Sequence, residues 1–290
     1  MRAELFSDIT HDLGEGINWD PSSQTLYWID ITRALLFGKK LPSGKIQSYS
    51  LPGMIGCMVT RKSGGLILAL QNGIHAFDPK TQSLEAWIDP EAHLPENRFN
   101  DGKCDPAGRL WAGTMSTRGT EGAGSLYRID SDRSLSKQLD QVTISNGLCW
   151  DMNRECMYYI DSPTRRVDRF DYDVLTGSIQ NRKSVIRLPE SRGIPDGMTI
   201  DAKGNLWIAE WGGGCVSCWD PDHSQLLQTI EVPAHRVTCC CFGGRELDTL
   251  FITTAREGAP EDELQRFPLA GAVFSCQPDV RGVAADSFKG

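Results

Sequence analysis

The chain repeats one pattern of apolar and polar positions six times. Each copy has a short apolar segment, a turn of the Asp-x-x-Gly kind, and a second segment rich in aromatic and β-branched residues, which predicts two strands joined by a tight turn. The first segments span 16–20, 56–59, 102–105, 147–151, 197–201 and 240–243, and the second segments span 26–30, 65–69, 110–112, 157–161, 206–209 and 250–253. No long stretch has a helical period, so we expect little helix.

The repeat interval indicates the architecture. Copies follow one another every 40–50 residues or so, roughly the length of a four-stranded propeller blade. Further strands follow the pairs, as at 73–78 and 179–188. We therefore predict an all-β fold, a six-bladed β-propeller with four-stranded blades, in one domain spanning 1–290. A two-domain sandwich would leave the period unexplained. We expect the strand-like segment at 3–8 to complete the last blade and close the ring, which removes an exposed sheet edge.

Composition narrows the functional classes. The net charge of −8 and the lack of a Lys/Arg run argue against nucleic acid as a partner. No apolar run approaches the roughly 20 residues that span a bilayer, and the first residues lack a signal-peptide core, so we expect a soluble, cytoplasmic protein with no membrane partner. The ten cysteines lack the spacing of a disulfide framework. The lone Cys-x-x-Cys at 215–218 has no second pair, which argues against a cysteine metal site.

Polar residues stand at the start of four inner strands. They are Glu15, Asn100 with Asp101, Asn146, and Asp196, each directly before or close to a glycine, where the backbone can turn or approach a ligand. For any one copy, an ordinary Asx-Gly turn is a sufficient explanation. Four copies at the same phase of the repeat indicate that these side chains converge, because the innermost strands of a propeller line its central channel.

Converging carboxylates and amides indicate a cation. Like charges in a small space raise a carboxyl pKa or require a counter-ion. An oxygen-only set of ligands suits one divalent ion such as Ca²⁺, Mg²⁺ or Mn²⁺, and carboxylate and water can also hold Zn²⁺ or Fe²⁺. Three or four protein ligands would leave positions open for water and substrate, which is typical of a catalytic site.

Several motifs together resemble one known family. They are Leu-Gly-Glu-Gly at 13–16, Asn-Arg-Phe-Asn-Asp-Gly-Lys at 97–103 with Asp-Pro-Ala-Gly-Arg at 105–109, Ile-Ser-Asn-Gly-Leu at 144–148, Tyr-Ile-Asp-Ser at 159–162, and Ile-Pro-Asp-Gly-Met at 194–198 with Asp-Ala-Lys-Gly-Asn-Leu-Trp at 201–207. On these motifs, nearly the whole chain resembles the senescence-marker-protein, regucalcin and gluconolactonase family of six-bladed propellers.

The resemblance implies an activity and a role for each site residue. Glu15, Asn146 and Asp196 would be the metal ligands, and Asp196 would double as the general base. Asn100 would lie beside the metal, in contact with substrate or a bound water, and Arg98 would bind sugar hydroxyls or the lactone oxygen. Arg98 could instead be a structural partner of Asp101. The implied reaction is hydrolysis of a small-molecule sugar lactone to the aldonic acid.

Two positions depart from the family pattern. Many members have proline where this chain has Ile17, a local change in the backbone. In the loop that follows 114–115, some relatives place an acidic residue that meets the substrate, whereas this chain has Arg118 nearby. We hypothesise that Arg118 reaches the channel mouth and favours a lactone with an anionic substituent. The alternative is an exposed loop arginine.

Two other functions are consistent with a propeller of this kind. A paraoxonase-type esterase would use a richer Ca²⁺ site with a catalytic histidine, and no histidine here precedes an inner strand. A calcium-binding regulatory or interaction propeller would bind the ion without turnover. The particular sugar, the metal and the oligomeric state are left open by the sequence.

Overall fold

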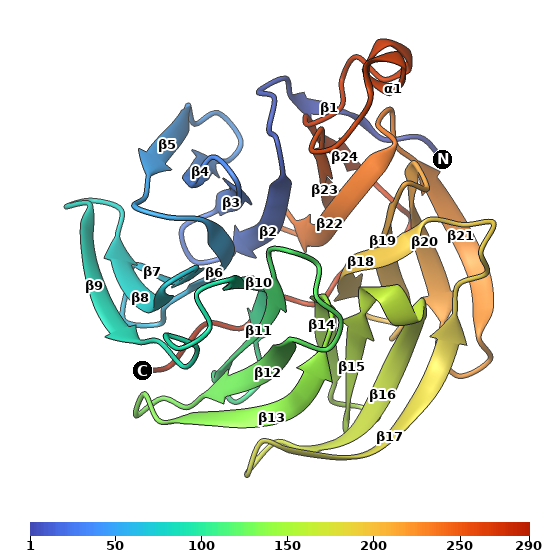
Figure 1. Ribbon diagram of the computed structural model, residues 1–290. Coiled ribbons are helices and arrows are strands. Elements are labelled where there is room, and N and C mark those ends of the chain that lie inside the picture. The colour runs from blue at the N-terminus through green and yellow to red at the C-terminus, as the bar shows by residue number, and fades with distance from the viewer.

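A computed structural model describes residues 1–290, and the chain is built almost entirely of β-strands (Figure 1). The strands nearest the centre are β2 (Gly14–Asp20), β6 (Ile55–Thr60), β10 (Asn97–Cys104), β14 (Ser145–Asp151), β18 (Ile194–Ile200) and β22 (Arg236–Gly243). The second strands are β3 (Thr25–Asp30), β7 (Leu66–Leu70), β11 (Leu110–Ser116), β15 (Cys156–Asp161), β19 (Leu206–Trp211) and β23 (Thr249–Ala255). The third strands are β4 (Leu35–Lys40), β8 (Gly73–Asp78), β12 (Gly124–Ile129), β16 (Arg166–Asp173), β20 (Cys215–Asp220) and β24 (Val273–Cys276). The outer strands are β5 (Ile46–Ser50), β9 (Ser83–Ile88), β13 (Leu135–Val142), β17 (Ser178–Arg187), β21 (Gln225–Glu231) and β1 (Glu4–Ser7).

The strands pair as antiparallel groups of four around a common centre, which is the arrangement of a β-propeller (Figure 1). Four groups are separate four-stranded sheets, and the other two are joined in one eight-stranded sheet. The join between β19 and β22 consists of the single pair Trp211 and Arg236. The all-β prediction is confirmed. Helix is limited to α1 (Glu261–Arg266) and one 3-10 turn, η1 (Ser162–Thr164). No helix has both the length and the apolar character needed to cross a membrane.

The Asp-x-x-Gly turns hold the first and second strands together. In the turn after β10, Asp105 Oδ1 accepts the backbone N–H of Arg109 at 2.9 Å, and Gly108 takes a φ of +82°. The second carboxylate oxygen of Asp105 accepts the indole N–H of Trp111 on β11 at 3.0 Å. The same arrangement recurs where Trp207 donates to Asp201 at 3.0 Å. The motif therefore fixes both the turn and the packing of the tryptophan that follows it.

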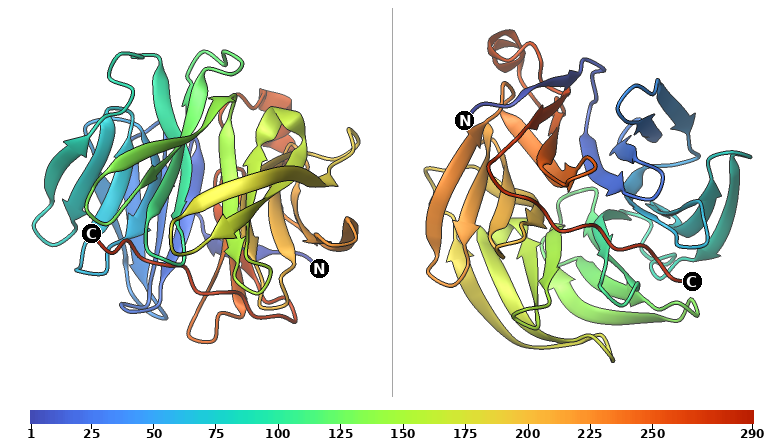
Figure 2. Two further views of the ribbon diagram at one scale, coloured as in Figure 1. Left: turned by 90° about the horizontal axis from the view of Figure 1, so that it is seen from below. Right: turned by 180° about the vertical axis from the view of Figure 1, so that it is seen from behind.

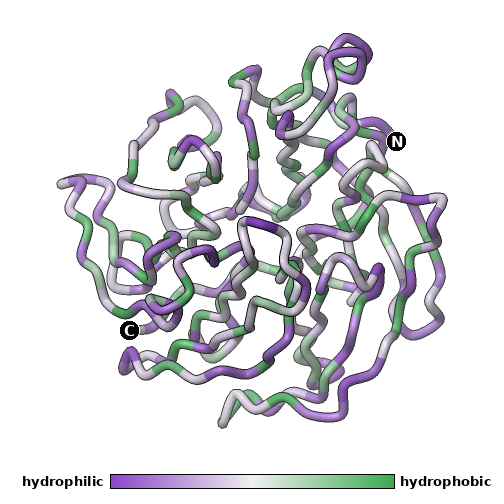
Figure 3. The backbone as a smooth tube through the Cα atoms, viewed as in Figure 1, coloured by the Kyte–Doolittle hydropathy of each residue, from purple (hydrophilic) through white to green (hydrophobic).

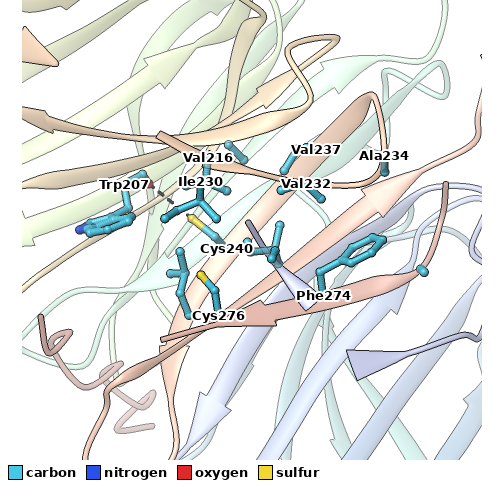
Figure 4. Close-up of a cluster of buried hydrophobic side chains, with 14 of the residues drawn as sticks. Trp207, Val216, Ile230, Val232, Ala234, Val237, Cys240, Phe274 and Cys276 are labelled. Carbon is cyan, nitrogen blue, oxygen red and sulfur yellow. Dashed lines mark hydrogen bonds between the residues drawn. The ribbon is translucent and has the colours of Figure 1, made fainter. Parts of the chain in front are cut away.

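The N-terminal strand closes the ring, as expected from the sequence. β1 pairs with β24, with Glu4 opposite Ser275 and Leu5 opposite Phe274. The core beside this junction combines aliphatic and aromatic side chains, among them Phe274, with the cysteines Cys240 and Cys276 (Figure 4). All ten cysteines are buried and free, so the prediction that they form no disulfide framework is confirmed. Apolar segments alternate with polar turns along every group of strands (Figure 3).

The C-terminal tail crosses the back of the propeller (Figure 2), a feature that the repeat pattern does not predict. Gly282 pairs with Asp201 at the end of β18, and Phe288 pairs with Arg61 after β6. Phe288 is fully buried in the core shared by the second and third groups of strands. The tail, residues 277–290, which we call the strap, therefore connects distant groups of strands across the end of the channel.

Candidate metal centre

The predicted site residues lie on four of the strands that surround the channel. Glu15 is in β2, Asn100 in β10, Asn146 in β14 and Asp196 in β18, and each is only 5–7% exposed. The strands begin earlier than expected, because the sequence analysis started the third inner strand at residue 102, whereas residues 97–104 form one continuous strand. A strand that lines a polar channel carries polar residues along its length, so an apolar pattern places its start too late.

Each polar residue lies where the pairing of its strand with the next one is interrupted by a bulge. The Oε2 atom of Glu15 accepts the backbone N–H of Gly16 at 2.9 Å, and Oδ1 of Asp101 accepts the N–H of Gly102 at 2.7 Å. Each of these two carboxylates is therefore fixed by the glycine that follows it. Asp101 lies one position further along its strand than Glu15, whose equivalent in the register is Asn100, and the sequence analysis proposed no ligand role for Asp101.

Hydrogen bonds connect three neighbouring inner strands. The Nδ2 atom of Asn100 donates to Oδ1 of Asn146 at 2.9 Å. The Nδ2 atom of Asn146 donates to Oγ of Ser162 at 2.8 Å, and that hydroxyl donates to the carbonyl oxygen of Pro195 at 2.7 Å. Asn146 is thereby held beside Asp196, the residue after Pro195. Sequence reasoning missed Ser162, although the motif at 159–162 contains it.

Glycine allows these strands to approach closely. A Cβ added to Gly147 would lie 2.7 Å from the carbonyl oxygen of Asp196 and 2.6 Å from the Cβ of Met198. Both distances are shorter than a carbon atom tolerates, so the glycine after Asn146 is required for β14 and β18 to pack.

Burial and mutual repulsion shift the pKa values of the acidic side chains in this site. Burial, and then the charge of Asp101, raise the pKa of Glu15 to about 8. Burial and the charges of Glu15 and Asp101 raise the pKa of Asp196 well above its usual range. Burial also raises the pKa of Asp101. Three carboxyl groups thus lie close enough to disfavour their common ionisation, as expected at a site that can take up a cation.

Arg98 is a buried cation whose charge acts on Glu15 and Asp196. It is 8% exposed, and its Nη1 donates to the carbonyl oxygen of Phe99 at 2.9 Å and to Oδ1 of Asn100 at 2.7 Å. Its hydrogen bonds do not reach Asp101, so the alternative role as a partner of Asp101 is not supported. Burial lowers the pKa of Arg98, and among neighbouring charges the exposed Glu257 opposes this shift most strongly. Sequence reasoning missed Glu257, which follows β23 at the channel mouth.

The donor set fits a divalent cation. Glu15, Asn146 and Asp196 supply carboxylate and amide oxygen atoms, which hard and borderline divalent ions prefer. A cation held there would offset the repulsion between the two carboxylates. No group of three or more His, Cys, Asp and Glu side chains is placed to hold a metal ion. A site at this position therefore depends on the amide oxygen of Asn146 as its third protein ligand.

The structure does not bring Arg118 to the site. Its guanidinium contacts Glu96 at 2.6 Å, and its side chain is 73% exposed. This contact corresponds to the alternative of an exposed loop arginine. The structure therefore shows no contact between Arg118 and the site residues that would support the hypothesis that Arg118 binds an anionic substituent.

Comparison with known proteins extends the resemblance over the full chain. Residues 13–256 match the family model described as the SMP-30/Gluconolactonase/LRE-like region. The Bacillus subtilis (strain 168) protein named "Putative sugar lactone lactonase YvrE" is 42% identical over all of this chain and 99% of its own length. Regucalcin of Xenopus laevis is 39% identical over 100% of this chain and 99% of its own length.

A solved structure agrees with these matches. The calcium-binding protein regucalcin of Agrobacterium tumefaciens superimposes with a TM-score of 0.94 at 30% identity, over 99% of this chain and 97% of that one. The Agrobacterium protein thus shares the fold of nearly the whole chain. The chain belongs to the SMP-30/gluconolactonase/LRE-like family.

Proposed function

We propose that this protein is a metal-dependent sugar lactonase, which hydrolyses an aldonolactone to the aldonic acid. The observation that carries the proposal is the placement of Glu15, Asn146 and Asp196 on three of the strands that surround the channel, with both carboxyl pKa values raised. The relative named as a sugar lactone lactonase supports the reaction class. The proposal includes a single six-bladed propeller domain spanning 1–290 and a cytoplasmic location.

Glu15, Asn146 and Asp196 would hold one divalent ion, and Ca²⁺, Zn²⁺, Mn²⁺, Mg²⁺ and Fe²⁺ are the candidates. When bound, the ion would polarise the lactone carbonyl and lower the pKa of water in its coordination shell. The description of the Agrobacterium relative as calcium-binding supports Ca²⁺ as one candidate. Hydrogen bonds from Asn100 and to Ser162 fix the Asn146 amide, so that its orientation does not depend on the ion.

Asp196 would act as the general base. Its buried carboxylate takes a proton from the water that attacks the lactone carbonyl carbon. The bond from that carbon to the ring oxygen then breaks, and Asp196 returns the proton to this oxygen, which becomes the hydroxyl of the acid. A cation bound to Asp196 would lower the pKa of this carboxyl, so the ion would supply much of the activation of the attacking water.

Arg98 and Asn100 would orient the lactone. The guanidinium of Arg98 is buried and uses Nη1 on Phe99 and Asn100, so its other N–H groups can donate to sugar hydroxyls or to the lactone oxygen. Asn100 links Arg98 to Asn146, so one chain of hydrogen bonds joins the substrate-binding and metal-binding groups. A lactone with an anionic substituent stays a prediction, tested by comparing neutral and anionic lactones on wild type and Arg118→Ala.

The test is lactone hydrolysis by metal-stripped protein that is resupplied with Ca²⁺, Mg²⁺, Mn²⁺, Zn²⁺ or Fe²⁺. We expect one or more of the ions to restore activity to wild type and none to restore it to Asp196→Ala. Asp196→Asn keeps an oxygen ligand but cannot accept the proton, so it should retain part of the metal affinity and lose activity by about a hundredfold or more. Asp262→Asn, an exposed acid on α1, is the matched control and should behave as wild type.

The alternative function is a calcium-binding regulatory or interaction propeller without turnover. It would be supported by tight Ca²⁺ binding to wild type, loss of that binding in Asp196→Ala, and no hydrolysis across neutral and anionic lactones. That outcome would contradict the lactonase proposal while keeping the metal site.

A further inference from the structure

A wide groove lies between the first group of strands, β2–β5, and the second group, β6–β9, on the face of the molecule that the strap crosses. Its volume is about 1240 Å³, and we call it the basic groove. The turns after β2 and β4 line one wall, the turns after β6 and β8 line the other, and Ser287 of the strap also contributes. None of the five predicted site residues lines it, so the basic groove is separate from the candidate metal centre.

The groove stays open because no side chain bridges this junction. Between the third and fourth groups, Arg109 in the turn after β10 donates to the carbonyl oxygen of Leu175 at 2.6 Å. Between the fourth and fifth groups, Arg154 in the turn after β14 pairs with Asp222 at 2.6 Å. The corresponding turn of the first group, residues 20–24, has no arginine and makes no hydrogen bond to the second group. The two walls are therefore not tied together.

Both walls of the basic groove carry lysine. Lys40 and Lys45 flank the turn after β4, and Lys62 follows β6, and all three are exposed and form no salt bridge. A fourth lysine, Lys80, lies beside Asp78, whose pKa is lowered first by the backbone N–H of Lys80 and also by its ammonium charge. Three ammonium groups are therefore available to a ligand, two on one wall and one on the other.

The two acids of the groove do not neutralise these three lysines. Asp20 accepts three hydrogen bonds from Ser22 and Ser23 in its own turn, at 2.6–2.9 Å. Asp78 accepts the backbone N–H of Lys80 at 2.8 Å. The chain as a whole has a net charge of −8, so the unpaired lysines concentrate positive potential at one place on an otherwise acidic molecule.

The rest of the lining is polar, because only 3 of its 23 residues are hydrophobic. The side-chain carbonyl of Gln47 accepts the hydroxyl of Tyr49 at 3.0 Å, and its amide N–H groups are free to donate. Gln82 makes no side-chain hydrogen bond. Arg61 donates to the carbonyl oxygen of Gly290 at 2.6 Å and is a fixed part of the wall. Such a lining suits a ligand with a hydroxylated body.

We propose that the basic groove binds a small hydroxylated molecule that carries two phosphate groups, as a sugar bisphosphate does. One phosphate would accept from Lys40 and Lys45 on the first wall and the other from Lys62 on the second. The amides of Gln47 and Gln82 would donate to hydroxyls of the ligand. Pockets for small molecules usually span about 300–1,000 Å³, so the groove has enough room.

A nucleic acid suits the groove less well than a small bisphosphate. A long polyanion would extend beyond the three lysines and meet the negative charge of the rest of the chain. The inference of a bisphosphate site does not depend on the lactonase proposal, since the two sites share no residue.

The experiment measures binding of fructose 1,6-bisphosphate, fructose 6-phosphate and fructose by calorimetry. Wild type should bind the bisphosphate more tightly than the monophosphate by about fivefold or more, because only the bisphosphate reaches both walls. Lys45→Met and Lys62→Met should each weaken binding of the bisphosphate by about fivefold, and the double variant by about twentyfold. Both lysines are exposed, so the variants should fold. Lys183→Met, at an exposed lysine of β17, is the matched control and should bind as wild type does.

Three outcomes would overturn the proposal. They are no saturable binding of the bisphosphate by wild type, equal affinity of the double variant and wild type for it, and equal affinity of wild type for the bisphosphate and the monophosphate. Asp196→Ala should bind the bisphosphate as wild type does, and loss of binding in that variant would place the ligand at the metal centre and refute the assignment. A single-stranded oligonucleotide that binds more tightly than the bisphosphate, and more weakly to the double variant, would assign the groove to nucleic acid instead.

Discussion

At the scale of single residues, the carboxylates of the candidate metal centre lower the stability of the fold. Glu15 and Asp196 are buried beside each other, and their glycine N–H contacts offset only part of the cost of desolvation. The same two carboxylates that would hold a cation therefore weaken the fold when no cation is present. Such a cost is commonly found where a protein builds an active site.

Glu15→Gln should stabilise the metal-free protein above pH 8. The pKa of Glu15 is about 8 in the folded chain and lower in the unfolded chain, so its ionisation removes stability as the pH rises from about 4.5 to 8. The glutamine does not ionise. Thermal unfolding in a chelator should give the variant a midpoint several degrees above wild type at pH 8.5 and equal to it near pH 4.5. Added divalent ion should raise the thermal unfolding midpoint of wild type but not that of Glu15→Gln.

His11 should make the protein sensitive to mild acid. Its Nδ1 contacts the carbonyl oxygen of Gly271 at 2.6 Å, and its Nε2 accepts the indole N–H of Trp28 at 2.9 Å, so the neutral ring satisfies both contacts. Burial lowers the pKa of His11 below 6.5. Its contribution is therefore complete above pH 6.5 and is lost as the pH falls through 6.5 towards the folded pKa.

The check is the free energy of unfolding of wild type and His11→Gln between pH 5 and 8. Glutamine can donate and accept at the same two places without titrating, so the variant should lose less stability than wild type on going from pH 7.5 to 5. His223→Gln, at an exposed histidine, is the control. Parallel curves for wild type and His11→Gln would show that His11 is not responsible.

At the scale of elements, the loop after β23 should set the charge preference of the channel mouth. Backbone N–H groups of Arg256 and Glu257 both donate to the carbonyl oxygen of Asp12 at 2.8 Å, and Arg236 donates to the carbonyl oxygen of Gly258 at 2.9 Å. This fixed loop presents the Glu257 carboxylate near Arg98. Glu257→Gln should raise kcat/KM for anionic lactones several-fold relative to neutral ones, because it removes a repulsive charge. Glu246→Gln, a change at an exposed acid in the β22–β23 turn, should leave the ratio unchanged.

The strap should contribute to stability through one side chain. Phe288 is fully buried, and its ring centroid lies 5.8 Å from that of Trp87. Phe288→Ala should cost about 3–5 kcal/mol of unfolding free energy, as large-to-small changes in a core usually do. Denaturant unfolding measures the loss, and Val283→Ala, at a half-exposed strap position, should cost much less. Equal stability of Phe288→Ala and wild type would mean that the strap does not pack in solution.

At the scale of the whole molecule, the repeat made the fold and most of the site predictable from the sequence. Glu15, Asn146 and Asp196 recur before glycine at one phase of the repeat, so their convergence follows from the architecture. Ser162 could not be identified in this way, because it follows a second strand and reaches the site only through the packing of neighbouring groups. Phe288 could not be predicted either, since the tail has no period and its bridge partner, Arg61, lies 227 residues earlier in the sequence.

Ring closure is the property of the whole molecule that can be tested most directly. β1 covers β24, and the N–H of Ala3 donates to the carbonyl oxygen of Glu231 on β21 at 2.8 Å, so the first residues join the two halves of the eight-stranded sheet. Deletion of residues 1–8 would leave β24 as an open edge beside an exposed core, and open edges pair with other chains. We expect the truncated protein to unfold at a temperature lower by ten degrees or so and to elute as oligomers in size-exclusion chromatography.

A peptide of residues 1–9, added in trans, tests whether the effect comes from strand pairing. It should restore the elution volume of the full chain and raise the unfolding temperature of the truncated protein, whereas the same peptide with Leu5→Pro should not, because proline removes a backbone donor from the strand. Leu5 is 47% exposed, so its side chain contributes little burial to lose. A truncated protein that elutes like the full chain and is equally stable would mean that hydrogen bonds from β1 are not what closes the ring.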